Sequence, residues 1–179
     1  QNNGFQVFGL KDTPFVDIDP SIRIITGTWW ANMLTDLVAD LHDCYQYLDR
    51  SKYNICYPHW GYEMELYPRP YTVKIGDQLL EQFDMVIGHH SHTPQPLITR
   101  NVGENSKLIA YSLGDFCNGL TYDVYRYGLV TKISLDLSSE DRWHPINGEW
   151  KFVEIIPDSK KNSATVLIRD SISYFQNFF

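Results

Sequence analysis

Three things are scarce in this chain of 179 residues: long apolar runs, positive charge and cysteine. No run of about 18 apolar residues occurs, so no segment is expected to span a membrane. The formal net charge of -7 argues against nucleic-acid binding through a broad basic surface. Cys44, Cys56 and Cys117 show no Cys-x-x-Cys spacing, so we expect three separate thiols that do not indicate a redox compartment.

The amino-terminal end lacks both an initiating Met and a secretory signal peptide. Residues 1–4 are typical of the interior of a longer protein. We therefore expect any export signal or membrane anchor to lie upstream of Gln1.

Apolar and aromatic residues are plentiful, at 43% and 15% of the chain, as in a globular protein with a substantial core. Their spacing predicts an α/β fold. The expected elements begin with a strand at 5–10, a loop at 11–21, and residues 22–25 as either a short strand or a loop anchor. A helix at 29–49 with Thr28 as N-cap, a strand at 53–58, a helix at 71–83 and strands at 85–88 and 107–113 follow. The last elements are antiparallel strands at 129–137 and 150–156 joined by a turn at 138–148, and a strand at 164–168. The strands at 53–58 and 85–88 flank a helix, so they should be parallel, and Gly76 should mark close contact between that helix and the sheet.

Histidines are concentrated where two of these strands end. Three of the six, His89, His90 and His92, follow the strand at 85–88, and His59 follows the strand at 53–58. Asp115 follows a third strand. Because ligands bind beyond the carboxyl ends of the strands in an open α/β sheet, we expect these side chains to meet.

Imidazoles from neighbouring strand ends suit a transition-metal site. Adjacent strands lie about 4.8 Å apart and a zinc–nitrogen bond is about 2.1 Å long, so one ion can join side chains from two strands. Imidazole suits Zn, Fe, Mn or Ni, whereas a pair of ions also needs carboxylates. Glu63 and Asp115 are candidates to orient ligands or contact the substrate.

A simpler interpretation is a buried histidine cluster held by hydrogen bonds, or loop histidines without function. Four histidines at two strand ends favour the metal site. For His89, lining the pocket is as good an interpretation as binding a metal, because it stands outside the His90-x-His92 pair. His42 and His144 are expected at the surface.

Three ordered motifs surround these residues: Tyr57-Pro-His-Trp-Gly-Tyr-Glu63, Val86-Ile-Gly-His-His-Ser-His-Thr-Pro-Gln95 and Tyr111-Ser-Leu-Gly-Asp-Phe116. They resemble the CapA (PgsA) family of capsule and poly-γ-glutamate biosynthesis proteins, which have the calcineurin-like metallophosphoesterase fold. The resemblance implies a mixed-sheet α/β/β/α sandwich with two metal ions at its strand ends.

The resemblance also implies roles for single residues. His59 and His90 would bind one divalent transition-metal ion, Zn, Mn or Fe, and His92 a second one. Glu63 matches the Glu of the family's His-Trp-Gly-x-Glu pattern, and Gln95 matches the Gln that follows the histidine pair.

Two features depart from the family pattern. Asp115 stands where the family usually has Asn. The motifs that supply the acidic bridge and further ligands are not recognised in this chain, and the resemblance places them upstream. We therefore expect residues 1–179 to be the C-terminal portion of a single CapA-like domain, incomplete at its N-terminus, with the missing N-terminal half as a partner.

The function implied is phosphoester or related hydrolysis in capsule or poly-γ-glutamate synthesis, at a bacterial cell envelope or elsewhere outside the cytoplasm. The substrate would be an anionic polymer or a phosphoester, in a cleft walled by the aromatic loop at 122–127. The alternative is a non-catalytic binding or assembly subunit of a polymer synthesis and export complex, with polymer-synthase membrane subunits as partners.

Overall fold

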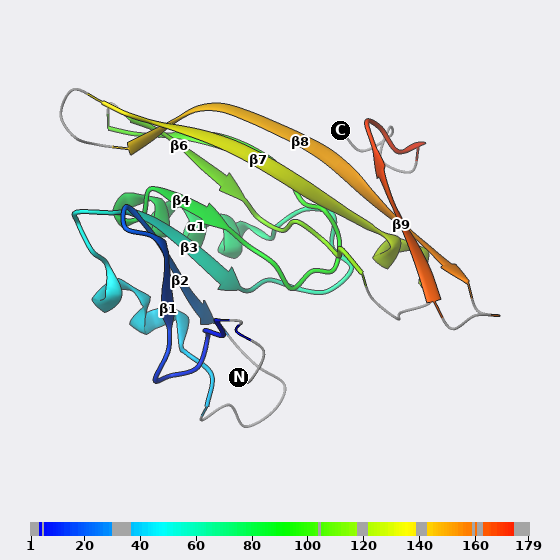
Figure 1. The fold of residues 1–179 in the computed structure, drawn as a ribbon, viewed down its shortest axis with the longest axis horizontal. Helices are drawn as coiled ribbons and strands as arrows, with labels where there is room; N and C mark the ends of the chain where they lie inside the picture. The colour runs from blue at the N-terminus through cyan, green and yellow to red at the C-terminus, as the bar shows by residue number, and fades with distance from the viewer. Residues whose placement is uncertain are drawn as a thin grey trace.

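The computed structural model describes residues 4, 6–29, 37–103, 105–117, 122–138, 143–158, 160 and 163–173. Two β-sheets form the framework of this part of the chain (Figure 1). The larger sheet has the order β1-β2-β3-β4-β6-β5, made of β1 (Phe15–Asp19), β2 (Ile22–Thr28), β3 (Tyr53–His59), β4 (Met85–Ile87), β6 (Asn105–Ala110) and β5 (Leu97–Val102). The smaller sheet contains β7 (Tyr127–Leu137), β8 (Trp143–Asp158) and β9 (Ser163–Arg169).

The centre of the larger sheet is parallel and its two edges are antiparallel. β2, β3, β4 and β6 run in the same direction, whereas β1 and β5 pair antiparallel with β2 and β6. The predicted parallel pairing of the strands around the helix is confirmed by β3 and β4. The carboxyl ends of four strands therefore meet at one edge of the sheet.

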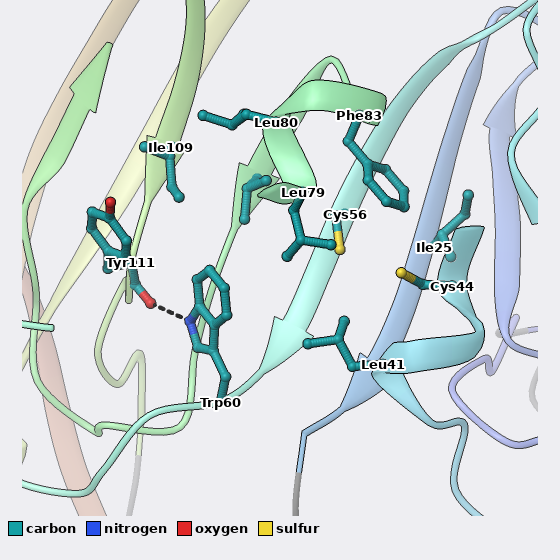
Figure 2. Packing of buried hydrophobic residues seen from close by; sticks show 11 residues of the cluster. Ile25, Leu41, Cys44, Cys56, Trp60, Leu79, Leu80, Phe83, Ile109 and Tyr111 are labelled. Carbon is teal, nitrogen blue, oxygen red and sulfur yellow. Dashed lines mark hydrogen bonds between the residues drawn. The ribbon is translucent and has the colours of Figure 1, made fainter. Parts of the chain in front are cut away.

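Helices cover one face of this sheet. The α-helix α1 (Pro70–Gln82) begins with proline, whose fixed φ and missing N–H suit the first turn. It packs beside the 3₁₀-helix η1 (Leu41–Tyr47) on a core that includes Leu79, Phe83 and Ile109 (Figure 2). A Cβ on Gly76 would lie 2.6 Å from Ile109 Cδ1, which confirms the predicted close contact with the sheet.

The smaller sheet covers the opposite face. Ile133 and Leu135 of β7 and Trp143 of β8 pack on a second core that includes Tyr53, Met85 and Leu108. The described residues therefore form three layers: helices, six-stranded sheet and three-stranded sheet. This confirms a mixed α/β fold, whereas the metallophosphoesterase type and its fourth, helical layer stay a prediction.

Two predicted elements are wrong in the described residues. Residues 6–9 form no strand, and Leu10 makes single bridges to Thr13 and Val38. Of the helix predicted at 29–49, residues 30–36 lie outside the described residues and the helical part is η1, with Asp40 rather than Thr28 as its N-cap. Ala39 instead donates to Gly9 O and accepts from Thr28 N, so tertiary hydrogen bonds override the helical pattern here.

Three other predictions need correction. β1 and β5 were missed, because the first lies in a segment rich in Asp and Pro and the second follows two prolines. The turn predicted at 138–148 is shorter, since β7 runs to Leu137 and β8 starts at Trp143, so the exposed His144 lies in a strand. All three cysteines are free thiols, but Cys44 and Cys56 share one core cluster.

No helix in the described part of the chain is both long and apolar enough to cross a membrane.

Candidate functional site

The parallel strands place the predicted histidines at one edge of the sheet. His59 is the last residue of β3, and His89 lies two residues beyond the end of β4. The two strand ends are joined by a bridge between His59 and His89, and Trp60 N donates to His89 O at 3.2 Å. Gly88 allows this approach, because a Cβ there would lie 2.2 Å from both Trp60 Nε1 and Tyr111 O.

The imidazole rings converge as the strand-end argument predicts. The ring centroids of His59 and His90 are 4.2 Å apart, and those of His59 and His89 are 5.1 Å apart. His92 lies further out, with its centroid 6.3 Å from that of His90. Side chains from two strand ends therefore form one continuous imidazole cluster.

Backbone strain is concentrated at this cluster. Among the described residues other than glycine, positive φ occurs at Met64, His90 and His92, with values of 64°, 107° and 59°. Such conformations cost on the order of 1–3 kcal/mol each and are typical of functional sites. Met64 belongs to the same site, because its N–H donates to Ser91 O at 2.9 Å between the two histidines.

Hydrogen bonds fix the orientation of two of the rings. His92 Nδ1 lies 3.0 and 3.2 Å from the two carboxylate oxygens of Asp115. A carboxylate only accepts, so a neutral His92 donates from Nδ1 and keeps its lone pair on Nε2. His59 Nδ1 lies 3.0 Å from Thr28 Oγ1, which can accept the same proton. This arrangement is typical of histidines that bind a metal through Nε2.

Burial keeps two rings of the cluster neutral. Desolvation, together with the charges of the nearby histidines, lowers the pKa of His89 to about 4. Desolvation also lowers the pKa of His90. Metal binding requires neutral imidazole, so the lowered pKa values of His89 and His90 favour the form that binds a metal.

His89 is held as part of a pocket wall. Its ring stacks on Tyr57 with centroids 4.5 Å apart. Both rings line a pocket of about 430 Å³ beside His59, which is completed by Phe8, Gly9, Thr26, Gly27, Thr28 and Val38.

The loop at 60–69, which includes Glu63, is hydrogen bonded to the loop that contains the histidines. Tyr125 OH lies 3.5 Å from Glu63 Oε2, and the Tyr125 ring meets His92 edge-on at 5.2 Å. Gln95 is buried and its Nε2 donates to Glu65 O at 2.7 Å, so this amide anchors the loop.

One residue of the site was missed from the sequence, and the contacts of a second were not foreseen. Thr28 lies at the carboxyl end of β2, beside His59, and the strand-end argument would have found it had β2 been assigned as a parallel strand. Tyr125 was included in the predicted aromatic wall without its contacts to Glu63 and His92. No sequence pattern predicts that the segment with Tyr125 contacts the loops that contain Glu63 and His92.

The described residues provide the right type of ligand for a metal centre, but too few ligands to complete one. Imidazoles whose Nδ1 atoms are held by Thr28 and Asp115 are suitable ligands. Within the part of the chain that the structure describes, however, no three His, Cys, Asp or Glu side chains are arranged to hold an ion.

One comparison with known proteins gave a match. A family model described as bacterial capsule synthesis protein PGA_cap matches residues 26–120, which is just over half of the chain and includes His59, His90, His92 and Asp115. No curated protein and no solved structure matches.

Proposed function

The chain belongs to the bacterial capsule synthesis protein family, and on that premise we propose a metal-dependent, hydrolase-type site at the carboxyl ends of β3 and β4. His59, His90 and His92 would bind two divalent transition-metal ions, Zn, Mn or Fe. The observation that carries the proposal is the imidazole cluster whose rings at residues 59 and 90 lie 4.2 Å apart. The metallophosphoesterase fold is part of the same proposal.

Bound ions would activate water or clamp a phosphate or carboxylate group of the substrate. The chain's own residues orient the ligands and shape the cleft. Asp115 fixes the tautomer of His92, and Thr28 holds the His59 ring. Glu63 and Tyr125 join the loop at 60–69 to the turn before β7, and the Tyr125 ring packs edge-on against His92.

Further ligands are needed, and we assign them to a segment outside the described residues. The N-terminal half of the domain, expected upstream, would supply the carboxylates that bridge two ions. This is consistent with histidines whose orientation is fixed although the described residues do not complete a coordination sphere.

The proposed substrate is a phosphoester or an anionic polymer of capsule or poly-γ-glutamate synthesis, and the proposed location is the bacterial cell envelope. Clustered ions would offset the net charge of -7 at the point where an anionic substrate binds.

The test is elemental analysis and a phosphodiesterase assay on the complete protein, with any segment that is encoded before Gln1. His90→Ala should lose most of the bound metal and activity. His144→Ala is the matched control, because His144 is exposed and lines a groove with Asn105 at the opposite ends of the strands. A complete protein that holds no transition metal, or a His90→Ala variant that keeps it, would reject the proposal.

A non-catalytic binding or assembly subunit is the second candidate. Exposed aromatic side chains favour it, since Tyr62, Phe116 and Tyr122 are 48%, 62% and 61% exposed near the cluster and could stack on a polymer without any metal. Capsular polymer binding that survives both EDTA and His59→Ala would support this candidate over the hydrolase.

A further inference from the structure

We infer that Cys44 and Cys56 are a disulfide-forming pair that can lock η1 to β3 behind the histidine cluster. The two residues are 12 positions apart in sequence, on different elements, yet both have 0% exposed surface and belong to the same core cluster. Both side chains are enclosed by the same apolar residues, among them Leu41, Leu79 and Phe83. Figure 2 shows the two sulfur atoms turned toward each other between Leu79, Leu41 and Ile25.

The surroundings favour this pairing over any pairing with Cys117. The third cysteine is exposed, beyond β6, whereas the pair lies in the core between the helices and the sheet. Core packing holds both side chains in place. A disulfide has a narrow range of allowed geometries, and a strained one is easily reduced, so a stable bond needs two side chains that already lie close together.

Burial also determines when the bond can form. Desolvation raises the pKa of Cys56, with the neighbouring Cys44 adding to the effect, so the thiolate that starts the exchange is scarce in the folded protein. Oxidation therefore takes place while η1 is undocked, during folding or local opening. Once formed, the bond is buried and protected from thiols.

The reaction needs an oxidant, for which we take an organic disulfide such as oxidised glutathione. One cysteine thiolate attacks it to give a mixed disulfide and one glutathione thiol. The other cysteine then displaces the second glutathione thiol and closes the Sγ–Sγ bond. Two protons and two electrons leave the cysteines, and one glutathione disulfide becomes two thiols.

The link would brace the site through the start of η1. A Cβ on Gly27 would lie 2.6 Å from Leu41 Cα, so the first residue of η1 rests directly on β2. The next residue of β2 is Thr28, whose Oγ1 holds His59 Nδ1. A cross-link that keeps η1 docked therefore keeps Thr28 and His59 in register.

Peptide mapping tests the pairing in the unaltered protein. Purified, reduced protein is equilibrated with glutathione redox buffers, alkylated under denaturing conditions and digested with trypsin. Cleavage at Arg23, Arg50, Lys52 and Lys74 separates Cys44, in residues 24–50, from Cys56, in residues 53–74. These two peptides should appear linked, lighter by two hydrogens than their sum, while Cys117 stays outside the link, either as an alkylatable thiol or as a mixed disulfide with glutathione.

Two variants serve as controls. Cys117→Ser should still form the 24–50/53–74 link, and Cys44→Ala should leave Cys56 alkylatable. Three alkylated cysteines at the most oxidising buffer, or a link that involves Cys117, would overturn the pairing. Amide exchange in η1 that is equally fast in linked and reduced protein would overturn the bracing.

Discussion

Single residues at this site are held in conformations that their types disfavour. His90 and His92 have positive φ without being glycine, and Gly88 and Gly114 occupy places where a Cβ would collide with neighbouring backbone. Packing of the surrounding residues therefore holds the loop after β4 in a backbone conformation that its own residues disfavour. This is typical of a segment shaped for function rather than for local stability.

Gly88→Ala should destabilise the protein by about 2–3 kcal/mol, because the added Cβ would lie 2.2 Å from Trp60 Nε1 and from Tyr111 O, which are hydrogen bonded at 2.9 Å. Urea denaturation would measure the loss. Gly148→Ala is the control, since a Cβ there meets nothing within 4 Å, and its effect should stay within about 0.5 kcal/mol. Equal effects for the two variants would contradict the packing at Gly88.

Thr28→Val should lower the affinity of the complete protein for zinc by about tenfold, because His59 would lose the partner of its Nδ1. Calorimetric titration with zinc would measure this. Thr26→Val is the control: Thr26 lies on the same strand, but its Oγ1 donates to Tyr57 O, so zinc affinity should be unchanged. Unchanged affinity in both variants would remove Thr28 from the site.

At the scale of elements, one carboxylate links the edge strand β1 of the larger sheet to its neighbours. Asp17 of β1 accepts hydrogen bonds from Arg23 Nε at 2.7 Å and from Lys52 Nζ at 2.6 Å, which ties β1 to β2 and to the start of β3. These bonds, that of Arg23 first, hold the pKa of Asp17 well below its ordinary value.

This pairing makes stability depend on pH. A carboxyl whose pKa is lower in the folded than in the unfolded state stabilises the fold above the unfolded pKa of about 4, and this contribution is lost as the pH falls below it. Asp17→Asn should cost about 1 kcal/mol at pH 7, a modest amount because the Asp17 side chain is 34% exposed. The difference from the wild type should shrink below about pH 4, as followed by urea denaturation across pH.

The exposed Asp12 provides the control for that prediction. Asp12→Asn should leave stability nearly unchanged at pH 7. A stability gap between the wild type and Asp17→Asn that stays constant down to low pH would contradict the role given to the carboxylate.

At the scale of the whole molecule, two sheets share one buried surface. The β7–β8 hairpin crosses the larger sheet in Figure 1, and Leu135 contributes to the core that includes Met85 and Leu108. The smaller sheet is also connected to the site, because Tyr125 contacts His92 and lies in the 3₁₀-helix η2 (Asp123–Arg126), which immediately precedes β7. Packing of the two sheets therefore positions one wall of the histidine cluster.

Leu135→Ala should cost about 1–3 kcal/mol, since Leu135 is partly buried between the sheets. Val130→Ala on the same strand is the control: Val130 is 42% exposed, so the loss should be about 0.5 kcal/mol or less. Differential scanning calorimetry would measure both. Two separate transitions in the Leu135→Ala protein would show that the sheets unfold independently.

The sequence by itself determined the parallel β3–α1–β4 unit and the convergence of its histidines. Apolar runs of strand length and a helical stripe are local signals, and the carboxyl ends of parallel strands necessarily share one edge of the sheet. The same logic correctly expected Gly76 to lie against the sheet, because a small residue in a helix interior needs a packing reason.

Only the tertiary structure decided the rest. The helix predicted at 29–49 shrinks to η1 in the described residues, because Ala39 bonds to Gly9 and Thr28 instead of to its own turn. Thr28, Tyr125 and the Cys44–Cys56 pair depend on which strands become neighbours, which is a matter of long-range packing. Local periodicity can state which face of an element is buried, but it does not identify the element that will cover it.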